Sequence, residues 1–214
     1  MKLISVNVGI PRRVPWRGDS VATAIFKEPV DHAVRLRRLN LDGDQQADLS
    51  VHGGPDKAVY AYPSEHYEFW RGELPDTELS WGAFGENFTT EGLQEGTTCI
   101  GDRFRIGSAR VTVTQPRMPC YKLGIRFDRN DIIKRFLASE RTGFYFSVLE
   151  EGEVRAGDTV ELLGRDPSHV SVTDVVRLYI AKKPDPDLVR RAAEVTALPA
   201  NWRDHLLQRL EGAS

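Results

Sequence analysis

Over the first two thirds of the chain, short runs of alternating apolar and polar residues are bounded by Gly, Pro and Asp. A period of two is typical of half-buried β-strands, and the bounding residues mark turns. The predicted strands cover 3–8, 22–26, 34–39, 58–62, 87–90, 103–106, 110–114, 143–149 and 159–162. Two helices are predicted between these strands, at 64–71 after a proline and at 130–138 with Asn130 as the N-cap.

The pattern changes after about Gly164. Apolar residues at helical spacing predict a helix at 171–181, and two more short helices are expected at 187–195 and 201–210. Three helices in about 45 residues bury little apolar surface alone. We therefore expect an α+β protein with two domains. Residues 1–166 would form a mainly β domain with peripheral helices, and residues 167–214 a small three-helix domain.

Composition narrows the class of protein. The 214 residues include 29 basic and 31 acidic side chains, a formal net charge of −2, whereas nucleic-acid-binding proteins usually carry a strong positive excess. No apolar run approaches the roughly 20 residues that span a bilayer, and Met1–Val8 alternates like a strand, unlike a signal peptide. With only Cys99 and Cys120, neither a disulfide framework nor a four-thiolate iron–sulfur site is expected. A reducing cytoplasm is the expected location.

The strongest candidate for chemistry is Cys120, in the segment Gln115-Pro-Arg-Met-Pro-Cys-Tyr-Lys122. Its two prolines make the backbone irregular, so the cysteine is expected in a loop just after a strand. Arg117 and Lys122 are positive neighbours that favour the thiolate, which is both a nucleophile and a soft metal ligand. From local sequence alone, a buried and inert cysteine remains the commoner alternative. We expect that role for Cys99, which lies in an apolar, strand-like stretch.

A second candidate is the turn Val51-His-Gly-Gly-Pro-Asp-Lys57. Backbone N–H groups at Gly53 and Gly54 can face an anion, Lys57 adds positive charge, and His52 is a hydrogen-bond donor for a phosphate or a substrate. The spacing is not that of a Walker loop. An ordinary tight turn with solvated charges is the alternative interpretation, and the residues alone favour it.

Two further candidates are single residues. Asn87, in Phe84-Gly-Glu-Asn-Phe-Thr-Thr-Glu-Gly92, has the donor and acceptor that suit the edge of a heteroaromatic ligand, although an ordinary edge strand explains it too. Lys27 ends a predicted strand, where a lysine is more often solvated than ligating.

A basic, proline-containing loop is expected around the arginines at 12, 13 and 17, and such loops are usually solvated. Several catalytic signatures are missing, among them the Gly-x-Ser-x-Gly elbow and the His-Glu-x-x-His and Cys-x-x-Cys zinc patterns. No Gly-x-Gly-x-x-Gly motif follows a strand, so a built-in nicotinamide or flavin site is not expected.

Taken together and in this order, three segments resemble the MOSC domain (molybdenum-cofactor sulfurase C-terminal), in its YiiM-like branch. They are residues 43–63, 84–92 and 101–123. The predicted three-helix tail resembles the small helical domain appended in that branch. The resemblance therefore covers nearly the whole chain.

The resemblance implies a closed or nearly closed MOSC-type β-barrel with peripheral helices, and a molybdenum cofactor with one pterin dithiolene. By similarity, Cys120 would be the protein ligand of molybdenum, Asn87 would contact the pterin, and Lys27 would lie near the cofactor phosphate. The remaining anion-binding surface would comprise His52, Gly53, Gly54, Lys57, Arg117 and Lys122.

The resemblance also implies an activity, the detoxifying reduction of N-hydroxylated compounds such as hydroxylamino-purines to amines. Electrons would come from an external reductase, because the sequence shows no flavin or iron–sulfur motif. Two alternatives use the same cysteine: a non-catalytic cofactor carrier and a persulfide sulfur-relay protein. Nucleic acid and membranes are not expected partners. The tail would cover the site, recruit the reductase or mediate a homodimer, and the sequence does not choose among these.

Overall fold

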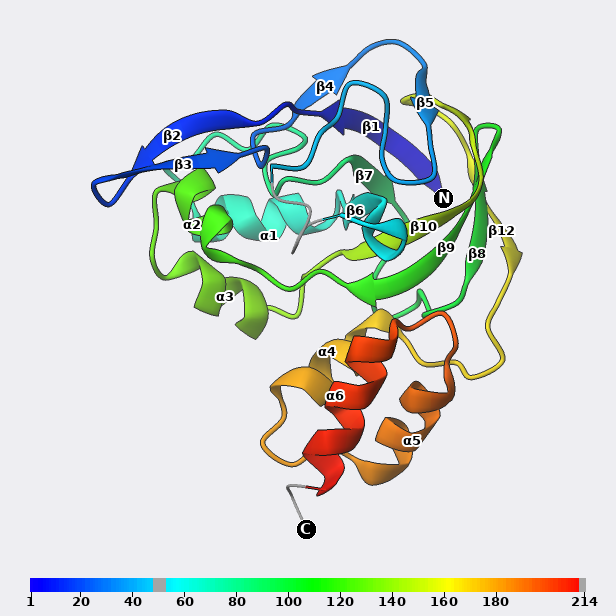
Figure 1. Ribbon diagram of the computed structural model, residues 1–214. Coiled ribbons are helices and arrows are strands. Elements are labelled where there is room, and N and C mark those ends of the chain that lie inside the picture. Colours follow the sequence, from blue (N-terminus) through cyan, green and yellow to red (C-terminus); the bar gives the residue numbers. More distant parts are fainter. Residues whose placement is uncertain (48–52, 212–214) are drawn as a thin grey trace.

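The computed structural model describes residues 1–47 and 53–211, and its largest element is a curved eight-stranded sheet (Figure 1). The strand order is β12-β8-β9-β10-β6-β7-β1-β4. Neighbouring strands are antiparallel, except that β6 and β7 are parallel. The strands are β1 (Lys2–Val8), β4 (Glu28–Val30), β6 (Val59–Pro63), β7 (Phe88–Glu91), β8 (Arg103–Ile106), β9 (Ala109–Pro116), β10 (Phe144–Glu150) and β12 (Val160–Gly164).

The sheet curls without closing into a complete barrel. Its edge strands β12 and β4 do not pair with each other. Instead, the start of β1 meets the turn before β12: Lys2 forms an isolated bridge with Thr159, and the Leu3 N–H donates to the Asp158 carbonyl at 2.9 Å. The mainly β, α+β fold class is confirmed. A fully closed barrel is not, because a short bridge beside a turn replaces the last strand ladder.

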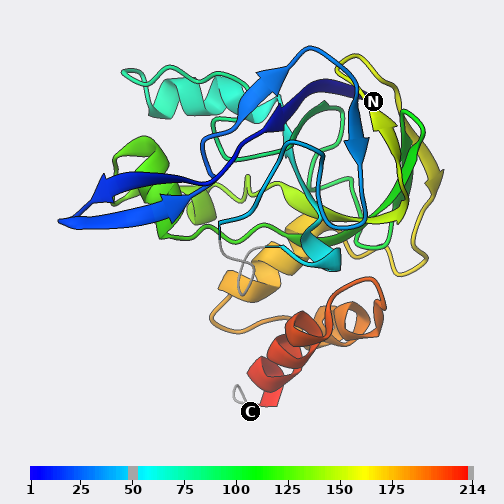
Figure 2. The ribbon, with the colours of Figure 1, turned by 45° about the horizontal axis from the view of Figure 1, so that its top comes forward.

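Two small ribbons flank the sheet. β2 (Arg12–Trp16) pairs with β3 (Asp19–Thr23), and β11 (Gly152–Val154) pairs with β5 (Val34–Leu36). The β2–β3 hairpin projects from the body of the molecule (Figures 1 and 2). The prediction of a loop around the first arginines was therefore wrong, and the predicted strand at 22–26 ends early. Most of the hairpin is exposed: Val14, Trp16 and Val21 are only half-buried and Thr23 alone is fully buried, so the apolar alternation is too weak to predict the two strands.

Three helices gather at the end of the sheet that carries this hairpin (Figure 1). They are α1 (His66–Glu73), α2 (Tyr121–Phe127) and α3 (Ile132–Ala138); the single 3₁₀ turn η1 spans Pro55–Lys57. An aromatic cluster holds the helices together, with Trp70 and Phe136 stacked at 5.8 Å between ring centroids. Sequence reasoning predicted α1 and α3 and missed α2, the helix that begins directly after Cys120.

The predicted tail helices are confirmed as α4 (Val172–Ile180), α5 (Pro186–Glu194) and α6 (Ala200–Glu211). Ser171 caps α4 in a capping box with Asp174. Apolar side chains of the three helices belong to the same buried cluster as those of the sheet. A domain boundary near residue 166 stays a prediction. No helix in the described part of the chain is long and apolar enough to span a membrane.

Candidate functional site

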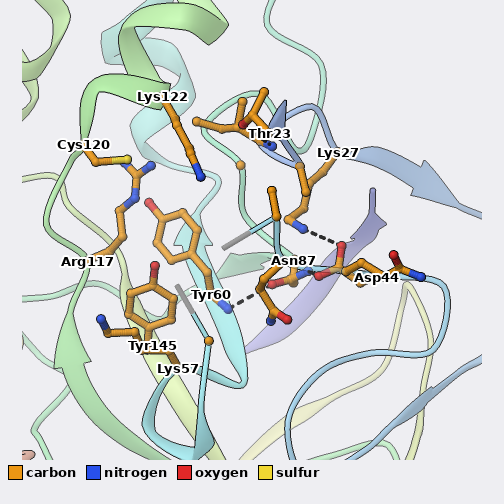
Figure 3. A pocket seen from close by; sticks show the side chains of 17 residues that line it. Thr23, Lys27, Asp44, Lys57, Tyr60, Asn87, Arg117, Cys120, Lys122 and Tyr145 are labelled. Atoms are coloured by element: carbon orange, nitrogen blue, oxygen red, sulfur yellow. Dashed lines mark hydrogen bonds and ion pairs between the residues drawn. The ribbon is translucent and has the colours of Figure 1, made fainter. Parts of the chain in front are cut away.

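A solvent-open cleft of about 610 Å³ lies where the segment after β3, the loop at 44–47, β6, β10 and the segment before α2 meet (Figure 3). Seven of the nine site residues singled out from the sequence line it. They are Lys27, Gly53, Lys57, Asn87, Arg117, Cys120 and Lys122. Gly54 follows a lining residue without lining the cleft itself, and His52 lies outside the described residues.

Cys120 is placed by the end of one strand and the start of a helix. After β9, the Arg117 N–H donates to the Gly143 carbonyl at 3.2 Å, which ties this segment to β10. Cys120 itself is extended and half-buried, and its carbonyl accepts from the Leu123 N–H at 2.9 Å in the first turn of α2. The thiol points toward Arg117 and the cleft (Figure 3). The expected position in a loop just after a strand is confirmed.

Arg117 is a buried cation, with only 6% of its surface exposed. Its guanidinium lies 5.2 Å from the centroid of the Tyr60 ring, and its buried Nη1 has no hydrogen-bond partner among the described residues. Burial opposes the charge of Arg117, but the neighbouring Tyr60, Tyr145 and Cys120 favour it, so that its pKa lies above the ordinary value. The guanidinium therefore remains positive and keeps unused donor capacity.

Lys122 is a second buried cation, with 7% exposed. Its ammonium points into the cleft (Figure 3). In the described part of the chain it makes no hydrogen bond or ion pair. Because a buried and uncompensated charge is costly, an anion in the cleft would stabilise this arrangement.

The opposite wall is organised by Asp44, a buried carboxylate that sequence reasoning missed. It accepts hydrogen bonds from the Lys27 ammonium, from the Gly9 N–H at 2.8 Å and from Asn87 Nδ2 at 2.9 Å. Asn87 Oδ1 in turn accepts from the Tyr60 N–H at 3.2 Å. The charge of Lys27 is thus balanced inside the protein, and the amide of Asn87 largely serves to frame the cleft.

Two tyrosines, also missed, form the aromatic part of the wall. The rings of Tyr60 and Tyr145 lie 5.4 Å apart between centroids, and the Tyr60 hydroxyl donates to the Thr142 carbonyl at 2.8 Å. Burial raises the pKa of both phenols, so both stay neutral. The strand predicted at 58–62 contained Tyr60, but alternation alone does not tell which cavity a strand residue faces.

The cleft is electropositive overall. Its described lining holds four basic side chains, those of Lys27, Lys57, Arg117 and Lys122, against the single carboxylate of Asp44. A soft sulfur donor lies at one edge, from Cys120. This donor set fits an anionic ligand that carries a thiophilic metal.

Comparison with known proteins agrees with this chemistry. Residues 48–161 match the MOSC domain family, and residues 170–213 match the YiiM-like, 3-alpha helix domain family. The chain belongs to the MOSC family. It resembles YflK of Bacillus subtilis (strain 168), with 42% identity over 97% of this chain and 93% of that protein. It also resembles YiiM of Escherichia coli (strain K12), with 40% identity over 89% of this chain and 86% of that protein.

Among solved structures, YiiM from Geobacillus stearothermophilus superimposes with a TM-score of 0.82 at 33% identity and covers 98% of each chain. A protein named "Reductase" from Gibberella moniliformis (strain M3125 / FGSC 7600) is 36% identical over 85% of this chain, which corresponds to 32% of that protein. The MOSC family is associated with binding of the molybdenum cofactor. The family predicted from the sequence is thus confirmed, and the roles of individual site residues stay predictions.

Proposed function

We propose that the cleft binds a molybdenum–pterin cofactor with Cys120 as the metal ligand, and that the protein reduces N-hydroxylated compounds such as hydroxylamino-purines to amines. The observation that carries the proposal is the pair of buried cations beside the Cys120 thiol, Arg117 and Lys122, neither of which has a carboxylate counter-ion among residues 1–47 and 53–211. A cofactor with an anionic phosphate and a thiophilic metal satisfies both features at once.

The basic side chains and the glycine turn would bind the anionic part of the cofactor. Arg117, Lys122 and Lys57 would hold the anionic groups of the cofactor. Gly53 and Gly54 have positive φ values of 111° and 88°, a conformation in which glycine N–H groups can turn toward an anion. His52 keeps its predicted role as a hydrogen-bond donor.

The opposite wall would fix orientation. Lys27 would lie near the cofactor phosphate, with its position set by Asp44. Asn87 would contact the pterin through the remaining acceptor capacity of Oδ1, because its N–H groups already donate to Asp44 and to the Asn7 carbonyl. Tyr60 and Tyr145 would shield one side of the cleft from water.

The bound cofactor would supply the two-electron chemistry that cleaves the N–O bond. The balance is R–NHOH plus two electrons and two protons, giving R–NH₂ and H₂O. The open side of the cleft gives solvent protons access to the substrate oxygen. Electrons would come from an external reductase, and the relative named "Reductase", in which the homologous region is about a third of a longer chain, supports such a partner.

The test uses protein from a host that synthesises the cofactor, with dithionite-reduced methyl viologen as the donor and a hydroxylamino-purine as substrate. We expect amine formation by wild type, loss in Cys120→Ala, and retention within about twofold in the matched variant Cys99→Ala. Bound molybdenum without activity across a panel of N-hydroxylated substrates would contradict the reductase and favour a cofactor carrier. A reactive thiol in protein without molybdenum would favour the persulfide relay.

A further inference from the structure

The projecting β2–β3 hairpin is a basic feature on a chain of slightly negative net charge. Arg12, Arg13 and Arg17 are exposed on it, and Asp19 is its one acidic residue. Because the whole chain carries a formal charge of −2, this positive excess is a local asymmetry and not a consequence of composition. Local asymmetry of this kind steers association with oppositely charged partners.

Two guanidinium groups share one aromatic ring at the base of the hairpin. Arg12 Cζ lies 3.8 Å from the centroid of the Phe26 ring, and Arg126 Cζ, on α2, lies 5.5 Å from the same centroid. Neither guanidinium has a carboxylate within ion-pair distance among the described residues, and the buried Nε of Arg126 has no hydrogen-bond partner there.

The two groups also act on each other. Burial lowers the pKa of Arg126, the charge of Arg12 adds to the lowering, and Tyr67 and Glu86 oppose it. By contrast, Arg129 and Arg135 nearby both pair with Asp131. Among the described residues, Arg12 and Arg126 thus have no carboxylate partner, whereas Arg129 and Arg135 do. Carboxylates of an acidic partner protein would supply the missing negative charge.

The hairpin is attached to the helix that follows Cys120. The Arg17 guanidinium donates to Asn130 Oδ1, and the Trp16 ring packs so closely on α2 that a Cβ at Gly124 would lie 3.6 Å from it. Thr23, paired with Arg12 at the base of the hairpin, lines the Cys120 cleft. A protein docked on the hairpin would therefore lie beside the cleft mouth.

From these observations we infer that the β2–β3 hairpin and Arg126 form a docking surface for an acidic electron-carrier protein. The need for electrons rests on the proposed function, because each N–O bond cleaved consumes two electrons and two protons while the carrier is oxidised. The unpaired arginines would attract an acidic protein whether or not the cleft reduces N-hydroxylated compounds. RNA and anionic membranes also carry negative charge, and the test includes both.

The first test measures binding by fluorescence anisotropy, with labelled flavodoxin as the acidic probe. Arg12→Glu/Arg13→Glu changes two exposed residues outside the cleft, and Arg190→Glu/Arg191→Glu on α5 is the matched control with the same change of charge. We expect binding to weaken about tenfold in the first variant and to change less than about twofold in the second. Raising the ionic strength from about 20 to about 200 mM should weaken binding to wild type more than binding to the first variant.

The second test compares two electron donors. With reduced flavodoxin, Arg12→Glu/Arg13→Glu should lose about tenfold in rate, whereas with methyl viologen it should stay within about twofold of wild type. Equal losses with both donors, no binding of flavodoxin to wild type, or equal weakening in the α5 control would overturn the docking surface. Tighter binding of RNA or of phosphatidylserine vesicles through the same arginines would also overturn it. Flavodoxin binding without amine formation from either donor rejects the proposed function and leaves the acidic-protein surface standing.

Discussion

Two hollows in the described structure have a cysteine in their lining, and their charges are arranged differently. With the space open to solvent included, the Cys120 cleft measures about 610 Å³, and a wider hollow between α1, α4 and the loop that holds Cys99 measures about 1690 Å³. In the wider hollow several polar and charged groups are paired: His66 contacts Glu95 at 2.7 Å, and Arg177 contacts Glu140 at 2.9 Å. In the smaller cleft, two buried cations, Arg117 and Lys122, have no carboxylate partner in the part of the chain that the structure describes.

The two cysteines also differ in the charges that lie beside their thiols. Burial and the neighbouring carboxylate of Asp102 raise the pKa of the Cys99 thiol, which keeps it protonated. Cys120 lies beside the buried cation Arg117 instead. The smaller cleft is the proposed binding site because unbalanced buried charge beside a soft donor is a stronger reason to expect a ligand than size is.

Gly143 makes backbone hydrogen bonds to a residue of each hollow, and its substitution is expected to have the largest effect on stability. Its N–H donates to Glu95 in the wider hollow, and its carbonyl accepts from Arg117 in the smaller one. Its φ is 62°, and a Cβ would lie 2.4 Å from the Ala61 carbonyl oxygen. Gly143→Ala should lower the free energy of unfolding by about 3 kcal/mol and displace Arg117.

The matched control for this prediction is Gly157→Ala. Gly157 also has a positive φ, 98°, but a Cβ there would meet no atom within 4 Å. The expected loss is about 1 kcal/mol, from backbone strain alone. Urea unfolding measures both variants, and equal losses would contradict the steric account of Gly143.

Glu86 lies between Gly85 and Asn87, two residues that line the smaller cleft. The fully buried carboxylate accepts from the Tyr67 hydroxyl and from the N–H groups of Gly82 and Phe84, at 2.9 and 3.0 Å. Glu86→Gln replaces a carboxyl group, which has at most one donor, by an amide with two N–H donors facing these donors, and should cost about 2 kcal/mol of the free energy of unfolding near pH 5. The exposed Glu78→Gln is the control and should leave stability unchanged.

The same variant tests a pH dependence. Burial raises the pKa of Glu86 above its ordinary value of 4.5, with hydrogen bonds opposing. The folded protein then holds a proton that the unfolded chain releases, so the stability from Glu86 is complete below pH 4.5 and falls as pH rises through the folded pKa. Urea titrations from pH 4 to about pH 7 should show the advantage of wild type over Glu86→Gln shrinking. An advantage that grows with pH would contradict the raised pKa.

Lys122 gives the smallest of these effects on stability, and with the opposite sign. Lys122→Met removes a buried charge without a partner in the described structure and should raise the free energy of unfolding of cofactor-free protein by about 1 kcal/mol. The same variant should bind the cofactor more weakly. Lys134→Met, at an exposed position, should change neither quantity. A destabilised Lys122→Met would mean that the ammonium is compensated inside the protein.

The sequence predicted the tail well because the signals there are local. Ser171 and Asp185 cap helices by contacts with residues two or three positions away, and apolar spacing identifies the buried faces. The β2–β3 hairpin was not predicted because its inner face is only half-buried and carries few apolar residues. The helix α2 was missed because prolines precede it and Gly124 lies within it, both poor helix signals.

The candidate site divides in the same way. Cys120, Asn87 and the Gly53–Gly54 turn belong to short motifs, and their joint order along the chain made them candidates although each alone was ambiguous. Asp44 gains its role from Lys27, Gly9 and Asn87, which lie 17, 35 and 43 positions away. No local pattern indicates such contacts, and only the folded chain brings them together.

The central claim is that Cys120 ligates molybdenum in the smaller cleft. Its most direct test is the molybdenum-to-protein ratio of wild type, Cys120→Ala and Cys99→Ala, purified from a host that makes the cofactor. The account predicts a similar molybdenum-to-protein ratio in wild type and in Cys99→Ala, and a ratio close to zero in Cys120→Ala. Equal molybdenum in both cysteine variants, or none in wild type, would contradict it.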